Sequence, residues 1–314
     1  LGPVAARVGI RAESGPDVRD VEAVRLAPRL TVRFTPVPEL ALSAGVARIY
    51  QYVQTVAPGG VHLASLVSTD AWILAGPGVP PIRSNVATAG LEVRVAPGRI
   101  MALNTFAREA DGMVVPNPEP GPVLDRSPSM LLGRNTAVGL EASVRQLSGP
   151  LTGSIAYSLT RSRMHVADYE FPSSADRTHV LSATGMIRPL PGLRMGAAFT
   201  AATGVPFTRA ISDSTACMGE PTCAPSELPW AGDPNASRGP TYASLDLLVD
   251  WATEVAGLSV GIYGQLRNVL GRENATVYAG GSGCLVVGCS VDALRNAYEE
   301  GVPRLPVIGV RVQY

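Results

Sequence analysis

Apolar and polar residues alternate one by one along many short stretches of this chain. In GLEASVRQL (139–147), Leu140, Ala142 and Val144 alternate with polar or charged residues, and RLPVIGVRVQY (304–314) repeats the pattern up to the last residue. Strict alternation is the two-residue period of a β-strand with one apolar and one polar face. Helical spacing is not sustained anywhere in the sequence, so the pattern predicts an all-β protein.

Twelve such segments can be counted along the chain. They lie near 4–12, 28–35, 39–52, 84–96, 99–114, 134–148, 151–164, 176–189, 192–207, 239–253, 257–275 and 304–314. Short connections built from turn residues alternate with long connections at 13–27, 53–83, 116–133, 165–175, 208–238 and 279–303. An antiparallel up-and-down meander with tight turns at one end and long loops at the other gives this alternation, which is typical of transmembrane β-barrels. Soluble β-sandwiches use Greek-key connections and have no reason to collect the long loops at one end.

Seven charged residues of the alternating segments fall on the polar face. They are Glu92, Arg94, Glu141, Arg145, Asp246, Asp250 and Arg311. A single arginine facing lipid at the bilayer midplane costs about 2–4 kcal/mol, whereas a charge facing a wet lumen costs little. The sequence therefore predicts a transmembrane antiparallel β-barrel of about 12 strands, with its apolar face toward lipid and its polar face toward the lumen.

Composition agrees with this reading and narrows the function. Hydrophobic residues make up 46% of the 314 residues and charged residues 17%, yet no stretch approaches the roughly 20 apolar residues of a membrane-spanning helix. The formal net charge is zero, which argues against a nucleic-acid-binding protein. We expect residues 1–314 to form one barrel domain. Because LGPVAARVGI already looks like a strand, we also expect the signal peptide and an N-terminal portion to be absent from this sequence.

The four cysteines form two close pairs in sequence, Cys217 with Cys223 and Cys284 with Cys289. Their spacings lack the CxxC signature and no histidine lies nearby, which argues against a zinc or iron–sulfur site. Both pairs fall in long loops on the expected outer side, where disulfides can persist. We therefore predict loop-stapling disulfides, although four cysteines allow three connectivities and the sequence does not choose among them.

The sequence offers little catalytic chemistry. Its three histidines are His62, His165 and His179, and no GxSxG motif or other recognisable nucleophile segment accompanies them. An outer-membrane hydrolase would need a Ser–His pair with a third orienting group. We predict that the protein is not an enzyme and that it carries no cofactor or metal.

Several motifs, taken in order, resemble one family. DRTHVLSAT (176–184), TGVPFTR (203–209), RGPTYASLDLLVDW (238–251), LRNVLGRENATVY (266–278) and the closing RLPVIGVRVQY are similar to the C-terminal barrel region of TonB-dependent outer-membrane receptors. LAPRLTVRFTPVPELALSAGVARIYQ (26–51) looks like a mid-barrel hairpin of the same family, so the resemblance covers nearly the whole chain.

The resemblance implies a location in the bacterial outer membrane and a role in uptake of a scarce nutrient such as an iron chelate, cobalamin or carbohydrate. It also implies that the outer-membrane assembly machinery reads the final strand through Ile308, Val310, Val312 and Tyr314. The family closes 22 strands around a plug, whereas this chain offers about twelve and no plug. Contact with TonB would therefore run through N-terminal parts that the sequence lacks. The alternative is a small outer-membrane pore or surface-anchoring barrel without TonB coupling.

Overall fold

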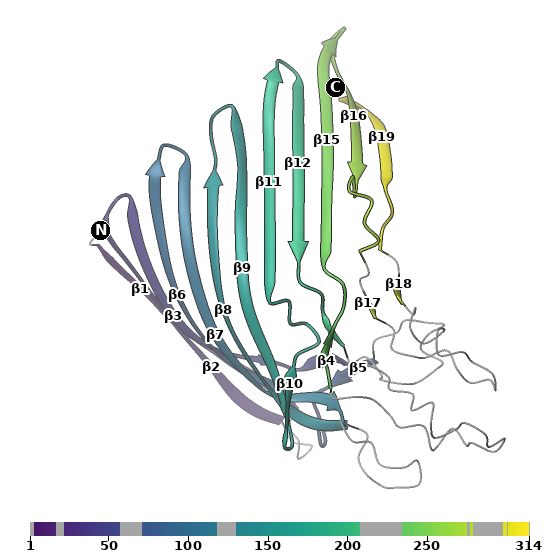
Figure 1. Ribbon diagram of the computed structural model, residues 1–314. Helices are drawn as coiled ribbons and strands as arrows, with labels where there is room; N and C mark the ends of the chain where they lie inside the picture. The colour runs from purple at the N-terminus through teal and green to yellow at the C-terminus, as the bar shows by residue number, and fades with distance from the viewer. Residues whose placement is uncertain are drawn as a thin grey trace, which may run out of the picture.

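A single curved antiparallel sheet makes up most of the protein (Figure 1). The computed structural model describes residues 3–16, 22–56, 71–117, 130–207, 234–274, 277–278, 298–299 and 301–313. The main strands are β1 (Val4–Pro16), β2 (Glu22–Val37), β3 (Leu40–Gln51), β6 (Ile82–Ala96), β7 (Arg99–Pro116), β8 (Met130–Gln146), β9 (Leu151–Val166), β11 (His179–Leu190), β12 (Leu193–Ala202), β15 (Tyr242–Val255), β16 (Leu258–Arg267) and β19 (Leu305–Gln313). The shorter strands are β4 (Val53–Val56), β5 (Ala71–Leu74), β10 (Tyr169–Pro172), β13 (Pro206–Phe207), β14 (Ser237–Arg238), β17 (Val277–Tyr278) and β18 (Tyr298–Glu299).

The twelve main strands follow one another across the sheet in chain order, each antiparallel to its neighbours. The short strand β10 pairs with β9 beside this path. Such a sheet is an up-and-down meander, and β1 and β19 lie at its two edges without pairing with each other (Figure 1). The predicted all-β, antiparallel up-and-down architecture with about twelve strands is confirmed.

The connections sort by length to the two ends of the sheet. At one end, the turn end, tight turns at 38–39, 97–98, 147–150, 191–192 and 256–257 join successive strands. Gly98, Gly192 and Gly257 adopt positive φ values of 71°, 78° and 81° there, a conformation that glycine enters without steric cost. All the longer connections leave the opposite end, the loop end. The predicted alternation of short and long connections is therefore confirmed.

Several predicted boundaries were wrong: the predicted strand 192–207, for example, ends at Ala202, and two other segments differ more. Residues 13–27 were expected to be a loop, but β1 continues to Pro16 and β2 begins at Glu22, with Glu13 opposite Arg25 in the ladder. The predicted strand 257–275 ends at Arg267, because Asn268 adopts a left-handed φ of 48° that breaks the extended run. Ladder hydrogen bonds require only the backbone, so strands can extend through sequence that has no alternation.

The apolar side chains cover the convex face of the sheet. In β9, Ile155 and Leu159 are exposed, whereas the adjacent polar residues Ser158 and Thr160 are half-buried on the concave side. Among the described residues only eight apolar side chains are buried, and five of those are alanines. No second layer covers the convex face in the described part of the chain, which excludes a β-sandwich and fits a barrel wall that faces lipid.

The convex face turns polar toward the loop end. Asn85, Glu109, Thr136 and Arg163 oppose one another in one row across β6, β7, β8 and β9. A membrane-crossing strand needs about 9–11 residues, whereas β7 has 18 and β8 has 17. These strands therefore continue beyond the apolar band as a wall that stands above the membrane surface.

Candidate functional site

The charged residues that the alternating pattern assigned to the polar face lie on the concave face of the sheet. The ladder carries Arg145 opposite Ser154, Ser154 opposite Thr184, Thr184 opposite Ala198, and Ala198 opposite Asp246. The same registers place all seven predicted residues on the concave side, namely Glu92, Arg94, Glu141, Arg145, Asp246, Asp250 and Arg311. The prediction that one polar face lines the inside of the wall is confirmed.

Ion pairs cross between strands on this concave face. Arg33 Nη2 lies 3.2 Å from Glu92 Oε1, and Arg267 Nε lies 3.7 Å from Asp246 Oδ2. The side chains of Arg33 and Glu92 are half-exposed, so water screens the pair and its contribution to stability is small. The concave face therefore presents positive and negative groups side by side.

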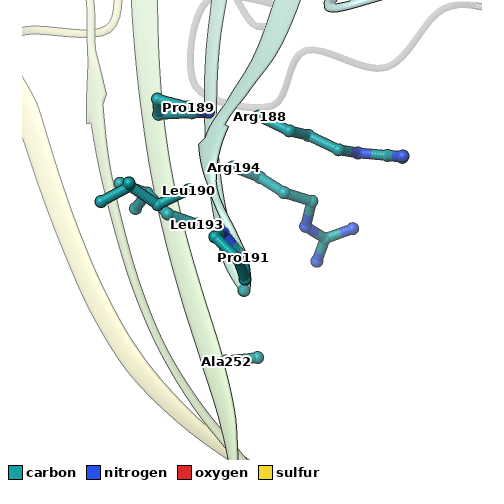
Figure 2. A pocket seen from close by; sticks show the side chains of 8 residues that line it. Arg188, Pro189, Leu190, Pro191, Leu193, Arg194 and Ala252 are labelled. Atoms are coloured by element: carbon teal, nitrogen blue, oxygen red, sulfur yellow. The ribbon is translucent and has the colours of Figure 1, made fainter.

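A more enclosed cluster lies near the turn end, around Asp250 on β15. The carboxylate is only 9% exposed and accepts hydrogen bonds from Arg194 on β12 (3.0 Å) and Arg311 on β19 (3.4 Å). Figure 2 shows the Arg188 and Arg194 side chains extending to the same side of the β11–β12 hairpin, beside a cavity of about 460 Å³. Arg188 makes no hydrogen bond or ion pair with any residue that the structure describes. Three guanidinium groups against one carboxylate give this corner a net positive charge.

At the loop end, the connections are tied to the sheet by buried polar side chains. Asp176 is 3% exposed; its Oδ1 accepts a hydrogen bond from the Ser162 backbone N–H (2.8 Å), and its Oδ2 is paired with the Arg238 guanidinium. Arg238 also donates to the carbonyls of Asp176 (3.0 Å) and Gly204 (3.2 Å). Strand β11 begins only at His179, so Asp176 occupies the place of the missing strand partner of β9.

A second tie joins the connection after β16 to β15. The Asn274 side chain accepts from the Ala243 N–H and donates to the Ala243 carbonyl, each at 2.8 Å, as a neighbouring strand would. Asn268 is also held in place by hydrogen bonds. Its backbone N–H donates to Asp246 Oδ1 (2.8 Å), and its side-chain amide donates to the carbonyl of Val302 (2.9 Å). The bases of the long connections are thus fixed on the wall.

The residues that make these ties belong to the sequence motifs that resemble the receptor family. Asp176 begins DRTHVLSAT and Arg238 begins RGPTYASLDLLVDW, while Asn268 and Asn274 both belong to LRNVLGRENATVY. The structure brings together residues 62 positions apart in the chain. The motifs were recognised, but the pairing between them carries no local signal in the sequence.

The residues predicted to form the assembly signal lie on the last strand. Ile308, Val310 and Val312 are on the convex face of β19, with exposed fractions of 81%, 68% and 59%. Tyr314 lies outside the described residues. The structure places three of these side chains where lipid would meet them, and their role in assembly stays a prediction.

The cysteines also lie outside the described residues, and their disulfides stay a prediction. We expect intact protein treated with an alkylating reagent to gain no label before reduction and four labels after it, because Cys217, Cys223, Cys284 and Cys289 are all predicted to be paired. Peptide mapping of the unreduced protein would then give the connectivity. Labelling of all four thiols without reduction would contradict the prediction.

The described histidines form no complete catalytic triad. On the convex face, His165 Nε2 lies 3.0 Å from Thr136 Oγ1, but its Nδ1 is 3.9 Å from Glu170 Oε2, too far for an orienting hydrogen bond. Thr136 sits within the β8 ladder, where neighbouring backbone N–H groups are used in strand pairing. His179 hydrogen-bonds the Tyr157 hydroxyl (2.7 Å), and His62 lies outside the described residues. Within the described ranges no three His, Cys, Asp or Glu side chains gather to hold a metal, and no helix is long and apolar enough to cross a membrane.

Solved structures share this arrangement, although no family model and no curated protein matches the chain. The ferripyoverdine receptor of the Pseudomonas aeruginosa outer membrane aligns over 98% of this chain and 36% of its own, with a TM-score of 0.63 and 12% identity. The chain has the fold of part of an outer-membrane β-barrel. BauA, the ferric preacinetobactin receptor from Acinetobacter baumannii, aligns over 98% of this chain and 40% of its own, with a TM-score of 0.62 and 11% identity.

The outer-membrane transporter YddB from Escherichia coli is similar in fold, with a TM-score of 0.58, 13% identity, and coverage of 87% of this chain and 40% of its own. The chain thus spans about two fifths of the length of these proteins. The sequence resemblance to the C-terminal barrel region of this group is borne out at the level of fold. These matched structures are receptors and transporters, not enzymes.

Proposed function

We propose that this chain forms part of the barrel wall of a TonB-dependent receptor that imports a scarce nutrient across the bacterial outer membrane. The observation that carries the proposal is the meander itself, with its lipid-compatible convex face, its charged concave face and its long connections at one end. An import protein needs an apolar outside, a polar path inside and a ligand-facing rim, and the wall supplies each of these.

An iron chelate is the substrate class to test first. The matched receptors include one bound to ferripyoverdine and one for ferric preacinetobactin. Ferric chelates often carry negative charge, and the net positive corner formed by Arg188, Arg194, Arg311 and Asp250 would favour an anion moving along the concave face. Cobalamin and carbohydrates remain alternative cargoes. Contact with TonB is proposed to lie outside these 314 residues.

The test is uptake by cells that carry or lack the intact gene. We expect deletion to abolish accumulation of at least one labelled ferric chelate under iron limitation, and we expect the same loss when TonB is deleted or the proton gradient is collapsed. A panel that includes labelled cobalamin and oligosaccharides identifies the cargo. Uptake that ignores both TonB and the gradient would contradict the proposal.

A passive pore or surface anchor is the second candidate, because the concave charges would also line an open channel. It predicts steady single-channel conductance when the purified protein enters a planar bilayer, whereas a receptor predicts a closed bilayer. The conductance recording therefore separates the two functions without any knowledge of the substrate.

A further inference from the structure

The convex face has a sharp boundary between apolar and charged rows on strands β8 and β9. Leu140 opposes Leu159 in one row, Val138 opposes Arg161 in the next, and Thr136 opposes Arg163 in the row beyond. On the convex face of β9, Arg161 is therefore the first charged residue in the direction from the turn end to the loop end.

Arg161 lies at the height of a bilayer surface. It is ten residues beyond Leu151, where β9 begins. At about 3.3 Å per residue and a tilt of about 45°, ten residues rise about 23 Å, close to the apolar band of about 25 Å in outer-membrane barrels. At this level the free-energy penalty of an arginine side chain is small, and the side chain contacts the lipid headgroups.

A groove of about 600 Å³ connects this charged row to the apolar rows below it. Val138, Leu140 and Leu159 form its apolar lining, and their exposed fractions of 54%, 41% and 39% show that no described segment covers them. Arg161 and Arg163 line the same groove at its loop-end side. The groove is thus amphipathic, with hydrocarbon on one side and guanidinium groups on the other.

The side chains of Arg161 and Arg163 differ from those of neighbouring arginines because no described carboxylate holds them in a close ion pair. Arg161 has no hydrogen-bond or ion-pair partner among the residues that the structure describes, and Arg163 has only a 3.9 Å contact with Glu170. By contrast, Arg134 is held by Asp111 at 2.6 Å. Arg238, at the far side of the groove, is already paired with Asp176. The available positive charge is therefore concentrated at Arg161 and Arg163.

We propose that this groove binds an outer-leaflet lipid that carries a phosphate headgroup. The phosphate would sit against Arg161 and Arg163, because guanidinium groups bind phosphate oxygens through paired, charge-assisted hydrogen bonds. One acyl chain would lie along Val138, Leu140 and Leu159. The proposal rests on the convex face and holds equally for a receptor or for a pore.

The first test uses the wild-type protein in detergent and needs no substitution. Binding is measured by native mass spectrometry with dioleoylphosphatidic acid, with dioleoylglycerol, which lacks the phosphate, and with inorganic phosphate alone. We expect the phosphatidic acid to bind at least tenfold more tightly than either of the others. Equal binding of dioleoylglycerol would overturn the headgroup site, and equal binding of inorganic phosphate would overturn the lipid site.

The second test locates the site with a matched control. We expect the double variant Arg161→Gln and Arg163→Gln to lose about tenfold in affinity for dioleoylphosphatidic acid, while Arg161→Lys retains most of it. Arg108 lies on β7, which pairs with the far side of β8, and it is on the concave face opposite Ala137, so Arg108→Gln removes a charge without touching the groove. An equal loss in Arg108→Gln, or no loss in the double variant, would overturn the proposal.

Discussion

Replacing Val249 with arginine is expected to destabilise the membrane-embedded wall by about 2–4 kcal/mol. Val249 lies on the convex face of β15, is 42% exposed, and stands six residues from the strand end at Val255. This position is close to the middle of a crossing of about 9–11 residues. The introduced guanidinium would face hydrocarbon with no partner, which is the most costly place for it.

The adjacent residue supplies the control, because Leu248 is also aliphatic but lies on the concave face, opposite Gly196 and Gln265. Leu248→Arg places the new charge between Asp246 and Asp250 along the same face, so we expect a loss below about 1 kcal/mol. Urea titration of both variants in phosphatidylcholine vesicles measures the difference. A larger loss in Leu248→Arg than in Val249→Arg would show that the assignment of the two faces is reversed.

Removing the Asp176 carboxylate is expected to loosen the loop end by about 3 kcal/mol, since it leaves the guanidinium of Arg238 and the N–H of Ser162 without their partner. A change of that size corresponds to about a hundredfold lower protection of the Ser162 amide against hydrogen exchange. Exchange measured by mass spectrometry on peptides from the end of β9 reports it directly.

Two further variants decide whether the buried pair is the cause. Glu170→Ala removes another carboxylate from the same connection. Glu170 is 54% exposed, and its ion pair with Arg163 is long at 3.9 Å and therefore weak, so we expect little change in the protection of the Ser162 amide. In the double variant Asp176→Ala and Arg238→Ala, part of the lost protection should return, because no unpaired charge is left. Equal losses in Glu170→Ala and Asp176→Ala would refute the special role of the pair.

The strands of this protein were predictable because lipid on one side and water on the other impose a two-residue period on the sequence. Val144, Ile155 and Val249 follow that period and lie on the expected face. The prediction failed where the constraint ends. Pro16 and Glu22 belong to a ladder that needs no apolar face, and the turn at Asn268 depends on contacts with Val302 that no local pattern records.

The candidate site was predictable only in part, for a related reason. The concave charges followed from alternation, but the choice of partner depends on register: Asp250 meets Arg311 although 61 residues separate them. The tie between Asp176 and Arg238 spans 62 residues and replaces a strand where β9 outruns β11. Such contacts are set by how far each strand extends, which the sequence did not reveal.

The two edges of the meander have a consequence for how the protein enters a membrane. Strand β1 pairs only with β2, and β19 pairs only with β16, among the described residues. Every second peptide group along each edge therefore turns its N–H and C=O outward, and in hydrocarbon each unsatisfied group costs several kcal/mol. A sheet with two unpaired edges is therefore unstable in the hydrocarbon of a bilayer. In a bilayer both edges therefore need a pairing partner, so edge pairing constrains membrane entry in addition to the apolar surface.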